Sequence, residues 1–271
     1  MRLMIRPNKR MGQHFLTDHE TIYRIVELSG YGESDCVLEI GPGRGALTIP
    51  LAKKVNSVVA VEKDRNLTRE LRDKLDLLKI DNVQILSEDI LRFNFQELPE
   101  IFKKRLKIIG NLPYNISSPF IEKLIKNRSM IQKAVLMFQL EFANRLSASP
   151  GGKEYGSLSV LIQYYAELFP IIEVSNDCFY PRPKVGSKVL AFNMEKPYPR
   201  RAEDEEFFKK VVKSAFSQRR KTILNSLKGS LTFSGDNITD ALRDCSIDPT
   251  RRAETLGMED FLNLASTLRE K

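Results

Sequence analysis

The sequence predicts an α/β protein with a doubly wound, mostly parallel sheet, followed by a small all-α domain. Three observations support this prediction. From about residue 36, short apolar runs alternate with helical periods, which is the pattern of strands that share a sheet through helical crossovers. A glycine-rich turn directly follows the first apolar run. After a Pro-rich, charged stretch at 195–201, only helical periods remain.

The elements of the first part are expected in a regular order. Cys36–Ile40 forms the first buried strand, because a continuous apolar run is typical of a strand covered on both faces. Further strands are expected at 57–61, 83–86, 106–109 and 133–138, with helices at 46–54 and 65–78. Runs at 171–174 and 189–192 are expected to complete the sheet, in an antiparallel direction.

The Pro-rich stretch is the best candidate for a domain boundary, because prolines and charges of this density interrupt both helices and strands. We therefore expect a first domain over 1–195, including a basic N-terminal arm, and a helical domain over 196–271. Within the second domain, helical periods are expected at 205–216, 219–227, 238–245 and 258–268.

The composition is that of a soluble globular protein, with 42% hydrophobic and 29% charged residues. No apolar run approaches the ~20 residues that span a bilayer. Three widely spaced cysteines without a nearby His argue against a structural metal and fit a reducing, cytoplasmic location. We expect a monomer without a metal and without a membrane partner.

The net charge of +8 is unevenly distributed. Residues 1–15 carry Arg2, Arg6, Lys9 and Arg10 with no acid, and residues 101–133 carry eight Lys or Arg against one acid. A third basic cluster comprises Arg219, Arg220, Lys221 and Lys228. These patches suggest a polyanionic partner such as RNA, with solvated surface lysines as the alternative.

Polar groups follow the ends of consecutive predicted strands, where open α/β sheets bind ligands. Glu39-Ile40-Gly41-Pro42-Gly43-Arg44-Gly45 has the spacing G-x-G-x-G, whereas dinucleotide sites have G-x-G-x-x-G. The leading acid and Pro42 disfavour a phosphate and suit a ligand with an amino group and a sulfonium. Glu62 could accept both hydroxyls of a ribose, and Asp89 the amine of an adenine. S-adenosylmethionine is favoured over a nicotinamide cofactor; a structural glycine turn and two helix N-caps are the alternatives.

The run Asn111-Leu112-Pro113-Tyr114 ends the fourth strand. The Asn111 side-chain oxygen can accept a hydrogen bond from an exocyclic amine. Pro113 keeps the loop extended so that carbonyls such as that of Leu112 point outward, and Tyr114 offers a face for an extruded base. The simpler interpretation is a strand followed by a proline turn.

With these motifs assembled, the chain resembles the ribosomal RNA adenine dimethyltransferase family, in its small-subunit, kasugamycin-resistance type. The similarity runs nearly end to end. It includes the motifs Gly12-Gln13-His14-Phe15-Leu16, Phe179-Tyr180-Pro181-Arg182-Pro183-Lys184-Val185 and Phe216-Ser217-Gln218-Arg219-Arg220-Lys221-Thr222. It implies a Rossmann-like class I methyltransferase fold and dimethylation of the N6 amines of adjacent adenosines in small-subunit (16S) ribosomal RNA.

The resemblance also implies roles for individual residues. S-adenosylmethionine is expected to contact His14, Leu16, Gly41, Gly43, Glu62, Asp89 and Asn111. His14 stands where the family often has Asn. Phe179 is expected to face Tyr114 across the target base, and Arg219, Arg220 and Lys221 to contact RNA within a pre-ribosomal particle. No strong base is evident, so catalysis would depend on alignment and fixed polar groups.

Two other functions stay open at this point. A large-subunit adenine methyltransferase conferring macrolide resistance would share the cofactor and Asn111 motifs. The basic helical tail and the run Asp248-Pro249-Thr250-Arg251-Arg252-Ala253-Glu254 favour the small-subunit reading. A non-catalytic RNA-binding assembly or transcription factor on the same fold is the second alternative, and the intact Asn111-Leu112-Pro113-Tyr114 run argues against it.

Overall fold

The computed structural model describes residues 12–98, 100–103 and 105–271, and the chain divides into two compact units. The first unit holds the residues up to 143 together with 168–195; the second holds 144–167 and 196–271. The chain passes from one unit to the other after residue 195, where we placed the domain boundary. Residues 144–167, expected in the first domain, group with the C-terminal helices instead, because α7 (Ser157–Tyr165) packs against α8 (Glu205–Ala215).

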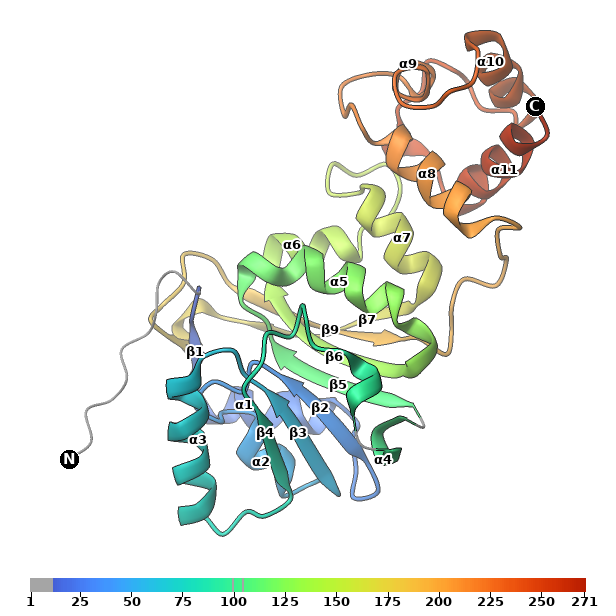
Figure 1. Ribbon diagram of the computed structural model, residues 1–271. Helices are drawn as coiled ribbons and strands as arrows, with labels where there is room; N and C mark the ends of the chain where they lie inside the picture. Colours follow the sequence, from blue (N-terminus) through green and yellow to red (C-terminus); the bar gives the residue numbers. More distant parts are fainter. Residues whose placement is uncertain (1–11, 99, 104) are drawn as a thin grey trace. The chain divides into compact units, whose positions relative to one another are not determined.

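A seven-stranded sheet forms the centre of the first unit, in the order β4-β3-β2-β5-β6-β9-β7 (Figure 1). The five strands from β4 to β6 are parallel, and β9 runs antiparallel to β6, as the sequence predicts for a strand that completes the sheet. The strands are β2 (Cys36–Ile40), β3 (Ser57–Val61), β4 (Val83–Leu86), β5 (Leu106–Asn111), β6 (Ile131–Gln139), β7 (Glu167–Val174) and β9 (Ser187–Asn193).

Helices cover both faces of this sheet. The principal core joins buried residues of α1 and α2 to one face of β2, β3, β5, β6 and β9, and α3 packs on β4 through Leu71, Leu75 and Ile85. Helix α5 lies over the opposite face (Figure 1). The helices are α1 (His19–Leu28), α2 (Thr48–Ala52), α3 (Arg65–Leu77), α4 (Glu100–Lys103), α5 (Ser117–Lys126) and α6 (Leu140–Leu146), the last of which crosses the unit boundary.

Helix α3 illustrates how the sequence specifies an element. Leu67, Leu71 and Leu75 recur at helical spacing and are buried, while the intervening residues are mostly charged. The Asp64 side chain accepts a hydrogen bond from the Asn66 backbone N–H, which caps the helix N-terminus. Helix α2 is shorter than expected, because a turn over 43–47 precedes Thr48.

A small second sheet joins two motifs that are far apart in the chain. Strand β1 (Phe15–Leu16) pairs antiparallel with β8 (Phe179–Tyr180), so that Phe15 is opposite Tyr180 and Leu16 is opposite Phe179. No local pattern in the sequence predicts this pairing. We call these two strands the β1–β8 ribbon.

The second unit is helical and contains α7, α8, α9 (Ile223–Lys228), α10 (Gly235–Asp244) and α11 (Met258–Arg269). The prediction of a helix from Arg219 was wrong. Helix α9 begins at Ile223, because Thr222 has extended backbone angles and its hydroxyl accepts the Asn225 backbone N–H. Single 3-10 turns lie at Phe95–Glu97, Tyr114–Ile116, Arg128–Met130, Asn176–Cys178 and Ala253–Thr255.

Candidate active site

The glycine turn after β2 needs glycine for two reasons. Gly41 and Gly43 have φ angles of +64° and +55°, which residues with a side chain rarely adopt. A Cβ atom on Gly43 would also lie 3.2 Å from the Phe15 ring. The turn therefore brings the backbone close to the N-terminal motif, and the N–H groups of Gly41 and Gly45 donate within the protein, to the carbonyls of Val61 and Pro42.

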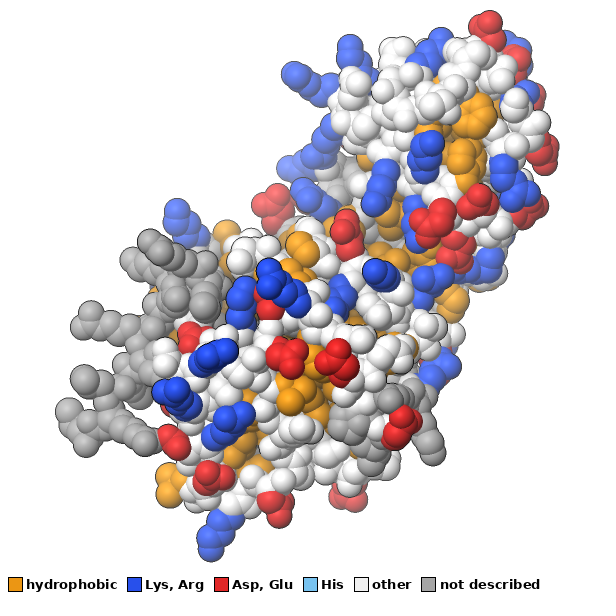
Figure 2. All heavy atoms as spheres, in the orientation of Figure 1, with side chains coloured by type: hydrophobic (Ala, Val, Ile, Leu, Met, Phe, Trp, Pro, Cys, Tyr) orange, Lys and Arg blue, Asp and Glu red, His pale blue; other side chains and the backbone are white. Residues whose placement is uncertain are grey.

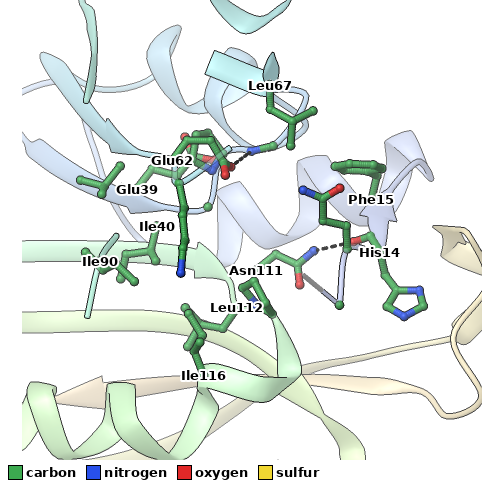
Figure 3. Close-up of a pocket in the computed structure, with 18 of the residues that line it drawn as sticks. His14, Phe15, Glu39, Ile40, Glu62, Leu67, Ile90, Asn111, Leu112 and Ile116 are labelled. Atoms are coloured by element: carbon green, nitrogen blue, oxygen red, sulfur yellow. Dashed lines mark hydrogen bonds between the residues drawn. The ribbon is translucent and has the colours of Figure 1, made fainter. Parts of the chain in front are cut away.

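Glu62 follows β3 and bridges this turn. Its Oε2 accepts the Gly43 N–H at 3.1 Å and its Oε1 accepts the Asp64 N–H at 2.9 Å (Figure 3). Burial raises the pKa of Glu62, and these two backbone donors oppose the increase. The carboxylate is held in one orientation, beside the glycine turn, before any ligand arrives.

Glu39 is a pocket residue that the site prediction did not include. It lies in β2 beside Glu62 (Figure 3), the residue is 1% exposed, and its Oε2 has no hydrogen-bond partner among the described residues. Burial raises the pKa of Glu39 to about 8; the nearby Thr48 hydroxyl opposes this increase, and the neighbouring Glu62 charge adds to it. The available signal was an acid two residues before Gly41, the first glycine of the motif. An unpartnered buried carboxyl oxygen is costly unless a ligand supplies a donor.

Asp89 lies beyond the end of β4 and forms the next part of the pocket. Its Oδ1 accepts the Leu91 N–H at 3.0 Å, and its Oδ2 lies 2.8 Å from the Lys63 ammonium group. Burial would raise the pKa of Asp89, but the Lys63 hydrogen bond and the Leu91 donor lower it overall. Asp89 is therefore a charged acceptor at neutral pH. Lys63 and the adjacent apolar Ile90 were not predicted.

Asn111 ends β5 and begins the loop that carries the acceptor motif. Its Nδ2 donates a hydrogen bond to the His14 carbonyl oxygen at 3.3 Å, so its Oδ1 is directed elsewhere (Figure 3). The Leu112 side chain is buried and its N–H donates to the Met137 carbonyl at 3.4 Å. Pro113 has φ −55° and ψ 134°, the extended geometry that the sequence predicts.

Tyr114 starts a 3-10 turn and is half-buried. Its hydroxyl is 3.3 Å from the Ser187 hydroxyl, and burial raises the Tyr114 pKa. The His14 ring lies beside the Tyr114 ring, with centroids 5.5 Å apart and an angle of 28° between the planes. Nδ1 of His14 donates to the Pro181 carbonyl at 2.6 Å. The imidazole thus contacts the acceptor loop, while the His14 carbonyl contacts Asn111.

Phe179 lies in the hydrophobic core, whereas the other residues predicted for the cofactor and base site line the pocket. Its side chain is 4% exposed and packs in the principal core with Leu16. Within the described part of the chain, Phe179 is not among the residues that line the pocket. The pairing of β8 with β1 turns Phe179 inward and leaves its neighbour Tyr180 60% exposed.

One pocket of about 220 Å³ unites most of these residues. The parallel register places the ends of β2, β3 and β5 level with one another, so residues distant in sequence converge. Of the predicted site residues, the pocket is lined by His14, Leu16, Gly41, Gly43, Glu62, Asp89, Asn111, Leu112, Pro113 and Tyr114. Glu39, Ile40, Lys63, Ile90 and Ile116 also line it.

The proposed RNA-contacting residues lie in the second unit, in the turn before α9. Arg219 is engaged with the Lys153 carbonyl and lies 3.9 Å from the Glu254 carboxylate. Arg220 and Lys221 are exposed and form no ion pair with another described residue. Figure 2 shows Lys and Arg side chains gathered on the side of this unit where the turn lies. The basic run Arg2, Arg6, Lys9 and Arg10 lies outside the described residues.

No group of three or more His, Cys, Asp or Glu side chains among the described residues could hold a metal ion. No helix in the same part of the chain is long and apolar enough to cross a membrane.

Comparison with known proteins identifies close relatives of the whole chain. The sequence pattern described as ribosomal RNA adenine dimethylase matches residues 4–270. A Desulforapulum autotrophicum protein named ribosomal RNA small subunit methyltransferase A is 45% identical over 262 residues, covering 96% of this chain and 91% of the relative. A Moorella thermoacetica protein of the same name is 44% identical and covers 97% and 92%.

Solved structures give the same fold at lower identity. A dimethyladenosine transferase from Plasmodium falciparum has a TM-score of 0.76 and 26% identity, over 92% of this chain and 95% of that one. The 23S rRNA methyltransferase ErmE has a TM-score of 0.71 and 26% identity, over 94% and 99%. The fold prediction is confirmed: a Rossmann-like methyltransferase sheet is present, with helices following it.

Proposed function

Because the chain belongs to the ribosomal RNA adenine dimethylase family, we propose that it transfers two methyl groups from S-adenosylmethionine to the N6 amine of each of two adjacent adenosines in small-subunit (16S) ribosomal RNA. It is an S-adenosylmethionine-dependent rRNA adenine-N6,N6-dimethyltransferase. The observation that carries this function is the convergence of the glycine turn, Glu62 and Asn111 in one pocket. A binding protein on the same fold would not need an amine acceptor beside a cofactor cradle.

The residues of the pocket fit this cofactor. S-adenosylmethionine carries an ammonium group and a sulfonium, and Oε2 of the buried Glu39 has no hydrogen-bond partner in the part of the chain that the structure describes. Glu62 is already fixed by two backbone donors and can accept ribose hydroxyls. Ile90, next to Asp89, provides an apolar surface for a purine ring.

The bound cofactor supplies an electrophilic methyl group; the protein aligns the acceptor. We assign Asn111 Oδ1 and the Leu112 carbonyl as acceptors for the two protons of the adenine amine. Hydrogen bonds at those positions favour a pyramidal nitrogen whose lone pair faces the methyl group. Since alignment alone can lower a barrier by several kcal/mol, no strong base is needed.

Tyr114 contributes an aromatic face for the extruded base, an interaction of ~1–3 kcal/mol for each stacked base. The His14 ring lies against that tyrosine, and Phe179 is buried. We therefore propose that Phe179 contacts the base only after the β1–β8 ribbon shifts. The cofactor side of the pocket needs no such movement, because Glu62 and the glycine turn are already in contact.

The RNA contacts, the particle that is methylated and the oligomeric state of the enzyme are also part of this proposal. The exposed Arg220 and Lys221 suit the phosphates of ribosomal RNA. We propose that the substrate is the RNA within a pre-ribosomal small-subunit particle in the cytoplasm, and that the enzyme acts as a monomer.

The test is mass spectrometry of small-subunit RNA after incubation with the enzyme and S-adenosylmethionine. We expect dimethylated adenine in adjacent positions, and far less of it with the Asn111→Ala variant in the same time. Large-subunit RNA incubated in parallel distinguishes the macrolide-resistance activity. Transfer of a radiolabelled methyl group to neither RNA would favour a non-catalytic assembly factor.

A further inference from the structure

Asp89, the proposed acceptor for the cofactor's adenine, already accepts one hydrogen bond on each of its oxygens in the free protein, which leaves a second lone pair on each. Asp89 has two carboxylate oxygens, and each has a partner: Oδ1 accepts the Leu91 N–H at 3.0 Å and Oδ2 is 2.8 Å from Nζ of Lys63. Lys63 follows Glu62 directly, so the lysine comes from the strand end that presents the ribose acceptor. Both Lys63 and Asp89 line the cofactor pocket.

The two partners of Asp89 differ in how easily they can leave. The Leu91 N–H belongs to the loop backbone and holds Oδ1 in a tight turn. The Lys63 side chain is 63% exposed, while that of Asp89 is 23% exposed. An ion pair with an exposed ammonium group is weak, because water can replace either partner. The Lys63 side of the carboxylate is therefore the side that a ligand can take.

We propose that Lys63 is a specificity-determining residue of the cofactor pocket, whose ammonium group holds Oδ2 of Asp89 in the free enzyme and competes there with the 6-amino group of the cofactor's adenine. This inference rests on the proposed function, since it assumes that the purine lies at Asp89. Loss of the ammonium group frees the acceptor and strengthens binding of an adenine ligand.

Lys63 should also reduce the preference of the pocket for a 6-amino purine over a 6-oxo purine. A 6-amino group donates to a carboxylate, whereas a 6-oxo group presents a second acceptor and is repelled by it. With Lys63 in place, the ammonium group lies between the two and can donate to the oxo group. Without it, Asp89 alone faces the purine, and the preference for the amine increases.

The experiment uses calorimetry with S-adenosylhomocysteine and its 6-oxo analogue, S-inosylhomocysteine, both of which have no net charge. In Lys63→Met, which keeps the apolar stem, we expect S-adenosylhomocysteine to bind ~2–5-fold more tightly and the oxo analogue to bind more weakly. Dissociation of S-adenosylhomocysteine from Lys63→Met, followed by stopped flow, should be slower than from the wild type by a similar factor. All three changes should be absent when Lys63→Met is made in an Asp89→Asn background.

Lys54→Met is the matched control, because Lys54 forms an ion pair of similar length, 2.7 Å with Glu27, and does not line the pocket. It should leave both affinities unchanged. Unchanged or weaker binding of S-adenosylhomocysteine by Lys63→Met would overturn the inference, as would an equal change for both ligands. Failure of the wild-type protein to bind S-adenosylhomocysteine would instead overturn the proposed function.

Discussion

The side-chain amide nitrogen of Asn111 donates a hydrogen bond to the backbone carbonyl oxygen of His14, across 3.3 Å. A carbonyl can only accept, so the contact determines which way the Asn111 amide is turned. Oδ1 of Asn111 therefore remains available to accept a hydrogen bond from the adenine amine that receives the methyl group. The contact also joins the N-terminal motif, through its main chain, to the loop expected to orient the base.

Replacing Asn111 with Ala should reduce turnover by roughly 10²–10³-fold, the usual effect of removing one preorganised hydrogen-bonding group. RNA affinity should change little, because the lost contact orients only the reacting amine. Single-turnover methylation and filter binding measure the two effects. Asn66→Ala, on the exposed surface of α3, is the control, and near-wild-type turnover in Asn111→Ala would exclude the proposed role.

Replacing Glu62 with Ala should weaken binding of S-adenosylmethionine by about 1.5–3 kcal/mol, the contribution of hydrogen bonds to a charged group. It should also lower the melting temperature, because the N–H groups of Gly43 and Asp64 lose their acceptor. Glu62→Gln keeps one carbonyl oxygen and should have intermediate effects. Unchanged affinity in calorimetry would remove Glu62 from the site.

Binding of S-adenosylmethionine should release protons through Glu39. In the free protein the Glu39 pKa is about 8, so the carboxyl group is mostly protonated at pH 7. A cationic ligand favours the carboxylate and lowers that pKa, and close to one proton should leave. Calorimetry in buffers of different ionisation enthalpy measures the number. Glu39→Gln should abolish the release; equal release in both proteins would contradict the assignment.

The same residue predicts a pH dependence of stability. Because burial raises the Glu39 pKa from 4.5 to about 8, the folded free protein binds more protons than the unfolded chain within that window. The contribution of Glu39 to the free energy of unfolding therefore falls as the pH rises from 4.5 to about 8, by up to ~1.4 kcal/mol per pH unit. Denaturation at several pH values should show a shallower decline for Glu39→Gln, and identical slopes would count against a buried neutral carboxyl group.

The basic residues of the turn before α9 should have two separate roles. We expect Arg220 and Lys221 to contact phosphates and Arg219 to stabilise the fold. Ala at Arg220 and Lys221 should flatten the dependence of log K on log salt by ~1.4–1.8, because two phosphate contacts are lost. Melting temperature and S-adenosylmethionine affinity should stay unchanged. Arg219→Ala should lower the melting temperature, because Arg219 contacts the Lys153 carbonyl. An unchanged salt slope in the double variant would rule out phosphate recognition.

The sequence by itself determined which residues could form a cofactor site. Gly41, Glu62 and Asn111 each follow a short apolar run, and the alternation of runs with helices predicts parallel strands. Because parallel strands end at the same edge of a sheet, the order of the motifs is sufficient to bring them together. The motifs that carry the family resemblance can likewise be recognised from short stretches of sequence, without the tertiary structure.

The tertiary structure alone decided how those residues are held. Pairing of β1 with β8 buries Phe179 and exposes Tyr180, although both are aromatic neighbours in the sequence. The raised pKa of Glu39 and the ion pair of Lys63 with Asp89 depend on burial and on distances between separate strands. Such properties arise from contacts between distant segments, which neither periodicity nor spacing records.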